Sequence, residues 1–256
     1  MVDYTVSGCI VTHNDEYTIG ATLRTLLQST QSVDLELFLV DNHSKDNTVA
    51  VAEKAAPEAH FLCNTKNIGF GAGHNKIIHN LQSKYHVIMN PDILLDQDAI
   101  GIMARYMDDH PDVMLCSPRI VFPITGIDQV LGKRNPTLRY LLASRLRFLK
   151  PAKAILDEYA MCDHDLTKPI EIENASGCFM MIRTDIFKQV GGFDERYFLY
   201  FEDCDLTRTL GLHGKTIYYP DAAIQHVWNR ESKKNLRLML VQIQSMIRYF
   251  RKWKNV

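Results

Sequence analysis

Three carboxylate side chains, Glu202, Asp203 and Asp205, directly follow an aromatic run at residues 197–201. Burying like charges beside aromatic rings is unfavourable, so such a cluster either faces solvent or forms a site that takes up a cation or a proton. Leucines at helical spacing follow: Leu206, Leu210 and Leu212, before Gly214. The carboxylates are therefore also expected in the first turn of an amphipathic helix, where the macrodipole favours negative charge. A helix start of this kind can present a general base into a cleft.

A second candidate group is Asn90-Pro91-Asp92, at the end of an apolar strand predicted over residues 85–89. Proline excludes an interior strand position, so Asp92 is expected just beyond the sheet, where it can face a ligand. One carboxylate and one amide suit a hard divalent cation that keeps some waters and shares phosphate oxygens. Taken alone, Asn-Pro-Asp is more often an ordinary turn, and His226 is more often a packed histidine than a ligand.

Strand, polar loop and helix alternate along the first part of the chain. Strands are predicted at residues 4–11, 35–40, 60–63 and 85–89. Nearly continuous apolar strands joined by helices indicate an α/β fold with a parallel sheet covered on both faces. In such sheets ligands bind at the carboxyl ends of the strands, which is where the polar loops of this chain recur.

The second part of the chain is less regular. After a helix to Asp109, strands are predicted at residues 113–116, 119–122, 174–182 and 216–219. The last of them is expected to end in a turn at Pro220-Asp221. The basic stretch at residues 133–153 is interpreted as a solvated helix face, with a partner-binding or membrane-facing excursion as the alternative.

Residues 233–256 are predicted to form a basic amphipathic helix. Its apolar face consists of Leu236, Leu240, Ile243, Ile247 and Phe250, and lysines and arginines crowd both ends. Two interpretations stay open. The helix packs against the domain, or it attaches to anionic lipid with Tyr249 and Trp253 at the level of the headgroups.

The composition excludes several classes of protein. The chain has 256 residues, of which 46% are hydrophobic and 23% charged, as expected for one globular domain at residues 1–232 before the C-terminal helix. A net charge of −1 argues against nucleic-acid binding. Six scattered cysteines without a Cys-x-x-Cys pair indicate reduced thiols. No segment has the pattern of a signal peptide or a spanning helix, so we expect a cytoplasmic protein, with peripheral contact at the inner face of the cell membrane as an option.

Taken together, the polar segments resemble those of family 2 glycosyltransferases, and in particular the bacterial rhamnosyltransferases of surface-polysaccharide biosynthesis. The matching segments are Val11-Thr12-His13-Asn14, residues 40–48, residues 67–75, Asn90-Pro91-Asp92, residues 191–198, Glu202-Asp203 and His226. The resemblance implies the GT-A fold, a single Rossmann-like nucleotide-binding domain with a mostly parallel central sheet. Its nucleotide-sugar half would cover about residues 1–96 and its acceptor half about residues 97–232.

The resemblance also implies a role for each matching residue. Those that would bind the nucleotide sugar are Thr12, Asn14, Asp41, Asn67, Gly69, Asn75 and Asn90. Among them, Asp41 would accept a hydrogen bond from the base. Asp92 matches the last residue of the family's Asp-x-Asp motif and would bind Mn²⁺ or Mg²⁺ at the donor diphosphate, with His226 as a further ligand. Asn90 stands in place of the motif's first aspartate, which leaves less negative charge for the cation.

The reaction implied by the resemblance is an inverting, metal-dependent hexosyl transfer. Asp203 would deprotonate the acceptor hydroxyl group, Glu202 would be a supporting or acceptor-binding carboxylate, and Ser176 and Gly177 would lie near the acceptor. The preferred donor is dTDP-rhamnose, and UDP-linked N-acetylglucosamine, galactose or glucose are alternatives. The acceptor would be a saccharide, free or linked to polyprenyl diphosphate.

Two other classes of function are weighed against this one. A nucleotide-sugar-binding protein without turnover is suggested by Asn90, where a metal-binding carboxylate is expected. A nucleotidyltransferase would carry a glycine-rich, basic phosphate loop near its N-terminus, whereas residues 11–16 of this chain are acidic.

Overall fold

The computed structural model describes residues 6–146, 148–227 and 236–254. The predicted boundary between the domain and the C-terminal helix, at residues 232 and 233, lies outside this part of the chain. None of the described helices is long and apolar enough to cross a membrane.

The first half of the molecule is a parallel sheet joined by helices, as predicted. Its strands are β1 (Val6–Thr12), β2 (Leu35–Asp41), β3 (His60–Cys63) and β4 (Tyr85–Met89). Its helices are α1 (Ile19–Ser29), α2 (Thr48–Ala55) and α3 (Phe70–Asn75). The strands lie in the order β3-β2-β1-β4 and all pair in parallel, so their carboxyl ends meet at one edge.

The second half continues the same sheet with mixed strand directions. It contains β5 (Ile93–Leu94), β6 (Val113–Val121), β7 (Ile170–Glu171), β8 (Phe179–Arg183) and β9 (Lys215–His226). The order continues from β4 as β8-β6-β9-β5, and β7 pairs with β9. Of the described strands in this half, only β6 and β9 pair in parallel, while β8 joins β4 and β6 in antiparallel register. The α/β class is confirmed, with parallel pairing concentrated in the first half.

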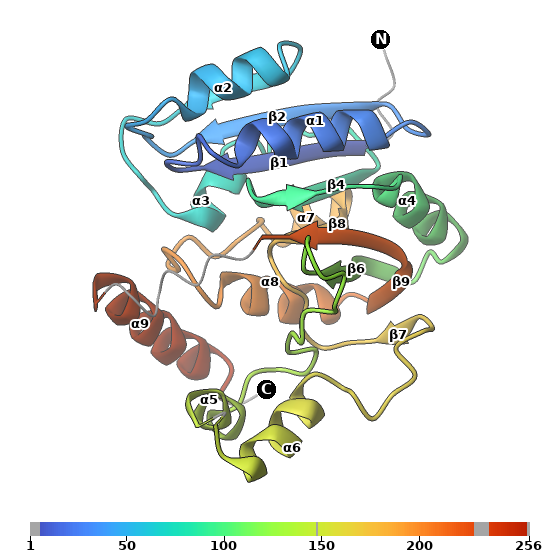
Figure 1. Ribbon diagram of the computed structural model, residues 1–256, viewed down its shortest axis with the longest axis vertical. Helices are drawn as coiled ribbons and strands as arrows, with labels where there is room; N and C mark the ends of the chain where they lie inside the picture. The colour runs from blue at the N-terminus through green and yellow to red at the C-terminus, as the bar shows by residue number, and fades with distance from the viewer. Residues whose placement is uncertain (1–5, 147, 228–235, 255–256) are drawn as a thin grey trace.

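Helices cover both faces of the sheet, so the molecule has three layers (Figure 1). The remaining helices are α4 (Ala99–Asp109), α5 (Leu138–Arg145), α6 (Lys150–Tyr159), α7 (Thr184–Gln189), α8 (Glu202–Gly211) and α9 (Leu236–Lys252). One hydrophobic core joins α1, α2 and α4 to one face of the strands, and another joins α7, α8 and the segment after α3 to the other. Alternate residues of β1 divide between the two cores, because successive side chains of a strand point to opposite faces.

Strand β9 differs from the sequence prediction at Pro220-Asp221. We expected a turn there, but the strand continues from Lys215 to His226. Its pairing with β6 shifts register at this point, since Pro118 pairs with Tyr219 and Arg119 pairs with Ala223. The extra residues form a bulge, which accommodates a proline in a strand without loss of the ladder beyond it. The continued strand carries His226 back toward β5.

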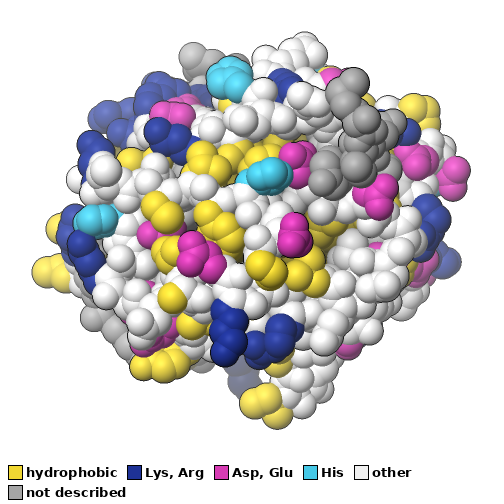
Figure 2. All heavy atoms as spheres, turned by 90° about the horizontal axis from the view of Figure 1, so that it is seen from above, with side chains coloured by type: hydrophobic (Ala, Val, Ile, Leu, Met, Phe, Trp, Pro, Cys, Tyr) yellow, Lys and Arg dark blue, Asp and Glu magenta, His cyan; other side chains and the backbone are white. Residues whose placement is uncertain are grey.

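The basic stretch at residues 133–153 is also only partly as predicted. It contains the helices α5 and the start of α6, but Lys133 and Arg134 precede both helices in a loop. Helices α5, α6 and α9 lie together at the end of the molecule opposite to α1 and α2 (Figure 1). On the face drawn in Figure 2, acidic and basic side chains are interspersed around a central group of hydrophobic ones.

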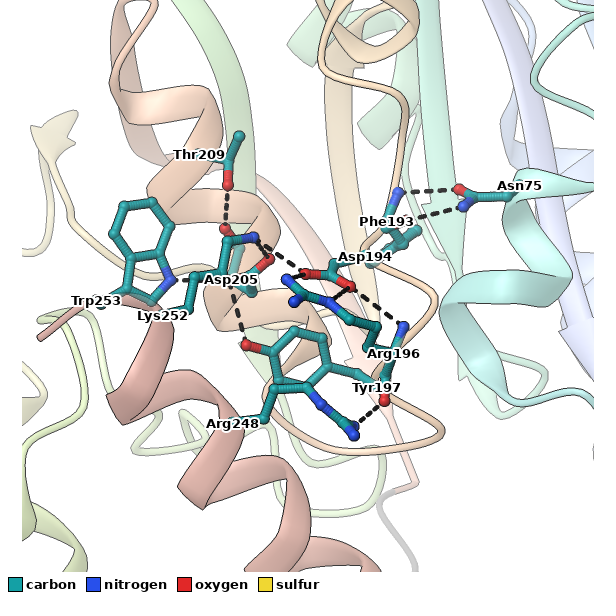
Figure 3. Close-up of polar contacts among 10 residues, drawn as sticks. All are labelled: Asn75, Phe193, Asp194, Arg196, Tyr197, Asp205, Thr209, Arg248, Lys252 and Trp253. Carbon is teal, nitrogen blue, oxygen red and sulfur yellow. Dashed lines mark hydrogen bonds and ion pairs between the residues drawn. The ribbon is translucent and has the colours of Figure 1, made fainter.

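Helix α9 packs against α8 through a buried carboxylate (Figure 3). Asp205 is only 2% exposed, and its side chain accepts hydrogen bonds from Trp253 Nε1 at 2.8 Å and Lys252 Nζ at 2.6 Å. The hydroxyl group of Tyr197 lies 3.3 Å from the same carboxylate. A buried charge needs partners of this kind, because its hydration is lost. Asp205 is thus a structural residue that joins the two helices.

The apolar face predicted for α9 stays largely exposed. Leu236, Leu240 and Ile247 are 69%, 52% and 42% exposed. The residues that pack are instead Tyr249 and Trp253, which are 0% and 9% exposed. The idea that these two aromatic residues sit at lipid headgroups is therefore wrong, because they pack with the domain's own aromatic residues.

We expect Trp253→Ala to lower the free energy of unfolding by about 3 kcal/mol, because it removes a packed aromatic ring and a hydrogen bond to a buried carboxylate. Urea denaturation of the purified proteins measures the change. Leu240→Ala, in the exposed part of the same helix, is the control and should change stability by less than about 0.5 kcal/mol. Equal effects of the two substitutions would contradict the role given to the buried end of α9.

Candidate active site

A cavity of about 840 Å³ lies at the carboxyl ends of the parallel strands. Nine of the eleven predicted site residues line it: Thr12, Asn14, Asn67, Gly69, Asn90, Asp92, Glu202, Asp203 and His226. Ser176 and Gly177, predicted to lie near the acceptor, line it too. The fold therefore brings together residues from both halves of the chain, as the topology of open α/β sheets predicts.

The start of α8 presents the acidic pair to the cavity. Tyr200 and Phe201, just before the helix, have positive φ angles of 69° and 66°. Two successive left-handed residues without glycine are strained, and strain of this kind persists only where packing holds it. Phe201 is buried, and its ring centroid lies 5.6 Å from that of Tyr249 in α9. In addition, Ser245 donates a hydrogen bond to the carbonyl oxygen of Leu199 at 2.8 Å.

Asp203 is held by two backbone N–H groups. Its Oδ2 accepts a hydrogen bond from the Gly177 N–H at 3.1 Å, and its Oδ1 accepts one from the Cys204 N–H at 2.8 Å. A side chain at position 177 would touch Asp203, since a Cβ added there would lie 3.1 Å from the Asp203 Cβ. These contacts orient the carboxylate and leave it at the cavity wall, which is the placement that a general base needs.

Glu202 differs from its neighbour in being buried. Its side chain is 5% exposed, and Oε2 has no hydrogen-bond partner among the described residues. Burial and the nearby charge of Asp203 hold the pKa of Glu202 well above its usual range. Burial therefore favours the protonated form of Glu202, in which the side chain can act as a hydrogen-bond donor.

Asp92 and His226 meet through strand pairing. Ile93 of β5 pairs with His226 of β9, and the Val227 N–H donates to the Asp92 carbonyl oxygen at 3.0 Å. His226 Nε2 consequently lies 3.2 Å from Asp92 Oδ1. Burial lowers the pKa of His226, but the neighbouring Cys178 and the hydrogen bond to Asp92 outweigh it and raise the pKa to about 10. The cavity wall therefore has a carboxylate and an imidazole side by side.

This pair fits a divalent cation that takes its other ligands from the substrate. A carboxylate, an imidazole and the amide of nearby Asn90 offer oxygen and nitrogen donors suited to Mn²⁺ or Mg²⁺. A bound metal ion would replace the proton on His226 Nε2. Within the described parts of the chain, no three His, Cys, Asp or Glu side chains gather into a metal site, so diphosphate oxygens and water would have to complete the coordination.

One side of the cavity is built by the loops after β1 and β3. Asn14 has a positive φ of 63°, and its Oδ1 accepts from the Lys45 N–H at 2.8 Å. Asn67 Oδ1 accepts from the Gly69 N–H at 2.9 Å. Gly69 has a φ of 96°, and a Cβ there would lie 2.3 Å from the Phe198 carbonyl oxygen. Only glycine therefore allows this loop to approach the segment that precedes α8.

Two predicted site residues do not line the cavity. Asp41 is buried directly behind it, where its Oδ1 accepts from Thr12 Oγ1 at 3.0 Å. Asn75 instead holds the segment before α8, because it accepts from the Phe193 N–H at 2.9 Å and donates to the Phe193 carbonyl oxygen at 2.8 Å (Figure 3). In this structure Asn75 positions another element of the site.

The cavity also contains residues outside the predicted set. Asp15 lines it. Burial raises the pKa of Asp15 to about 6, although a hydrogen bond from the His13 N–H acts in the opposite direction. Arg237, Leu238 and Val241 of α9 line the same cavity. The sequence signal for Asp15 was its place in the polar loop after β1. No sequence signal placed α9 there, because that contact depends on how the helix packs.

Comparison with known proteins identifies the class. The model of the family described as "Glycosyl transferase family 2" matches residues 7–191, which is most of the chain. The chain belongs to this family. The order of its motifs and the α/β fold agree with the match.

Two similar proteins of known activity within this family are rhamnosyltransferases. The chain is 27% identical over 219 residues to N-acetylglucosaminyl-diphospho-decaprenol L-rhamnosyltransferase of Mycobacterium tuberculosis, an alignment that covers 75% of this chain and 66% of the relative. It is 24% identical over 163 residues to rhamnosyltransferase WbbL of Escherichia coli K12, covering 60% and 58%. The chain thus spans less than two thirds of the length of each of these relatives. It resembles bacterial rhamnosyltransferases, as the sequence motifs indicated.

Solved structures agree on the fold. A mannosyltransferase of Pyrobaculum calidifontis in complex with GDP-Man and Mn²⁺ superposes with a TM-score of 0.67 at 15% identity, covering 99% of this chain and 65% of that one. GalNAc-T7 with UDP, GalNAc and Mn²⁺ superposes with a TM-score of 0.68 at 14% identity, covering 94% and 47%. The protein has the GT-A fold.

The buried state of Glu202 predicts a pH-dependent stability. In the unfolded chain, Glu202 releases its proton as pH rises past its ordinary pKa of 4.5. In the folded protein the pKa is higher, so the proton is retained to higher pH. The stabilising effect of this proton is therefore complete below pH 4.5 and is lost as pH rises, by up to about 1.4 kcal/mol per pH unit. Relative to the wild type, Glu202→Gln should gain free energy of unfolding steadily from pH 5 to pH 8. Urea denaturation across this range measures the difference, and Glu58→Gln at an exposed site should follow the wild type. Parallel profiles for Glu202→Gln and the wild type would show that Glu202 is ionised in the folded state.

Proposed function

We propose that this glycosyltransferase moves rhamnose from dTDP-rhamnose to a lipid-linked saccharide, with inversion at the anomeric carbon. The observation that carries the proposal is the position of Asp203, fixed by two backbone N–H groups at the wall of the cavity that also holds Asp92 and His226. The choice of rhamnose rests on the likeness to the mycobacterial and Escherichia coli rhamnosyltransferases. UDP-linked N-acetylglucosamine, galactose and glucose are the alternative donors.

The proposed reaction is a single displacement. Asp203 accepts the proton of the acceptor hydroxyl group, the acceptor oxygen forms a bond to the anomeric carbon, and the bond from that carbon to the diphosphate oxygen breaks. General-base assistance of this kind contributes roughly 10²–10⁴-fold to the rate. In the protonated form, which burial favours, the carboxyl group of Glu202 can donate a hydrogen bond to the acceptor or to Asp203 and adds no second negative charge.

Asp92 and His226 would hold a divalent cation, which supplies Lewis-acid neutralisation of charge on the leaving diphosphate. The Mn²⁺ in the two similar solved structures supports a metal-dependent reaction. Thr12, Asn14, Asn67 and Gly69 form the wall on which the nucleotide would rest. Because Asn90 takes the place of a carboxylate, the diphosphate itself would have to bring charge to the cation, so we expect metal and donor to bind together.

The acceptor is proposed to be a sugar on polyprenyl diphosphate. The mycobacterial relative is named for an acceptor of this kind, N-acetylglucosaminyl-diphospho-decaprenol. Exposed hydrophobic side chains of α5 and α9 support contact with a membrane, where this substrate resides. They include Leu138, Leu142, Leu236, Leu240 and Ile247, each more than 40% exposed. Arg145 of α5 lies 3.4 Å from Gln242 of α9, so the two helices are neighbours and a basic side chain lies between them.

Asp203→Asn should lower kcat for transfer by about 10²–10⁴-fold and leave donor binding unchanged, because it removes the base and keeps the shape of the side chain. Purified protein is assayed for release of nucleoside diphosphate from dTDP-rhamnose and UDP-sugars with a lipid-linked N-acetylglucosamine acceptor, with and without Mn²⁺ or Mg²⁺. Asp34→Asn, at an exposed site, is the control. Full turnover by Asp203→Asn would contradict the mechanism, and donor binding without any turnover by the wild type would favour a non-catalytic binding protein.

Replacing Leu236, Leu240 and Ile247 with glutamine should reduce sedimentation with vesicles of anionic phospholipid at least fivefold, because it removes the exposed apolar face of α9. Deleting the whole helix would also remove Tyr249 and Trp253 from the core, so the triple substitution is the cleaner test. A matched substitution of Leu27, which is 41% exposed on α1, should leave sedimentation unchanged. Unchanged vesicle binding by the triple variant would exclude α9 as the membrane contact.

A further inference from the structure

A second, smaller cavity of about 190 Å³ lies beside the active-site cavity. Its walls come from β6, from the segment between β6 and α5, and from residues 172–176 before β8. The side chains that matter here are Lys133, Asn174, Tyr218, Gln129 and the pair Arg119 and Asp128. Most of the remaining wall is apolar. None of these residues belongs to the predicted donor or metal site.

The two cavities are neighbours through direct contacts. Ser176 lines both of them, and the next residue, Gly177, donates its N–H to Asp203. Gln129 lines the small cavity and donates to the carbonyl oxygen of His226 at 2.6 Å. A ligand whose hydroxyl group lies at Asp203 would therefore extend naturally past Ser176 into the small cavity.

Lys133 brings a positive charge to this cavity, and the described residues supply no counter-ion for it. Its Nζ lies 4.6 Å from the centre of the Tyr218 ring, and no carboxylate within the described residues is at ion-pair distance from it. Asp128 also lines the cavity, but its Oδ1 accepts from Arg119 Nε at 2.6 Å. Burial lowers the pKa of Lys133, and Cys162 and Asp128, which form no ion pair with it, only partly offset this effect.

The loop that carries Lys133 is fixed by its backbone. The Lys133 N–H donates to the Tyr159 carbonyl oxygen at 2.9 Å, and the Lys133 carbonyl oxygen accepts from the N–H groups of Glu173 and Asn174. Asn174 is 7% exposed, donates to the Gly132 carbonyl oxygen at 2.8 Å, and has an Oδ1 without a partner in the described chain. The backbone of Lys133 is thus fixed at the cavity, and its ammonium group lies over the Tyr218 ring.

We propose that this cavity binds an anionic oxygen group of the acceptor, a phosphate or a carboxylate attached to the sugar whose hydroxyl group reacts, with Lys133 as its counter-ion. The proposal rests on the proposed transferase function and names the part of the acceptor that the enzyme recognises. A half-buried ammonium group with no counter-ion is unfavourable, and an anionic ligand group removes this penalty. Tyr218 keeps the charge in place when no acceptor is bound, through a cation–π contact.

Binding of three acceptor analogues tests the proposal without requiring turnover. They are N-acetylglucosamine on undecyl diphosphate, the neutral undecyl glycoside of N-acetylglucosamine, and the undecyl glycoside of glucuronic acid. Each is titrated into the full-length protein with dTDP and Mg²⁺ occupying the donor site. We expect Lys133→Gln to weaken binding of an anionic analogue at least tenfold and to leave the neutral one within twofold. Lys133→Arg, which keeps the charge, should retain most of the affinity, and Lys54→Gln on exposed α2 is the control.

The outcomes distinguish a phosphate from a carboxylate as the bound anion. They also distinguish a failure of this proposal from a failure of the proposed transferase reaction. Loss confined to the diphosphate analogue identifies a phosphate, and loss confined to the glucuronide identifies a carboxylate. Equal loss for neutral and anionic analogues, or no tighter binding of either anionic analogue than of the neutral one by the wild type, overturns the proposal. Donor cleavage that needs Asp203 is measured separately, so a failed transferase assay with intact Lys133-dependent binding would count against the proposed reaction alone.

Discussion

The buried carboxylate of Asp205 is the constraint on which the active-site end of this protein depends. A carboxylate that is 2% exposed must be matched by donors, and Trp253, Lys252 and Tyr197 supply them. Two of these donors come from the end of α9, so the contact joins α9 to the start of α8. The same packing places Tyr249 against Phe201, in the left-handed turn that precedes Glu202 and Asp203. The orientation of the acidic pair is therefore maintained by a helix that lies much further along the chain.

Sheet pairing imposes the second constraint. The antiparallel strand β8 joins the parallel half of the sheet to the mixed half, and the Asn90 N–H donates to the Cys178 carbonyl oxygen at 2.9 Å across this join. The short strand β5 then folds back against β9 and sets Asp92 beside His226. Residues from both halves of the chain consequently face one cavity even though they are far apart in the sequence.

The electrostatics of the site divide it into regions with different chemistry. The acidic side, with Asp92, Asp203 and the buried Glu202, suits a cation and a proton transfer. Beyond Ser176, the ammonium group of Lys133, which has no counter-ion among the described residues, suits an anion. Apolar side chains exposed on α5 and α9 border the same end of the molecule. In the proposed reaction, the donor diphosphate with its metal ion, the acceptor sugar and the lipid of the acceptor would each contact a different one of these regions.

The sequence by itself determined the α/β class, the parallel strands of the first half and the acidic start of α8, because these depend on local hydrophobic periodicity and helix-end chemistry. The resemblance of its motifs to those of family 2 glycosyltransferases also pointed to nine residues that line the cavity. Only the tertiary structure decided that β9 continues through Pro220-Asp221, that Asn75 holds the segment near Phe193, and that α9 buries Tyr249 and Trp253 while its leucines stay exposed. It also moved Lys133 from an expected solvated helix face to the wall of a cavity. These outcomes depend on contacts between residues far apart in the chain, about which a local pattern of hydrophobic and charged residues carries no information.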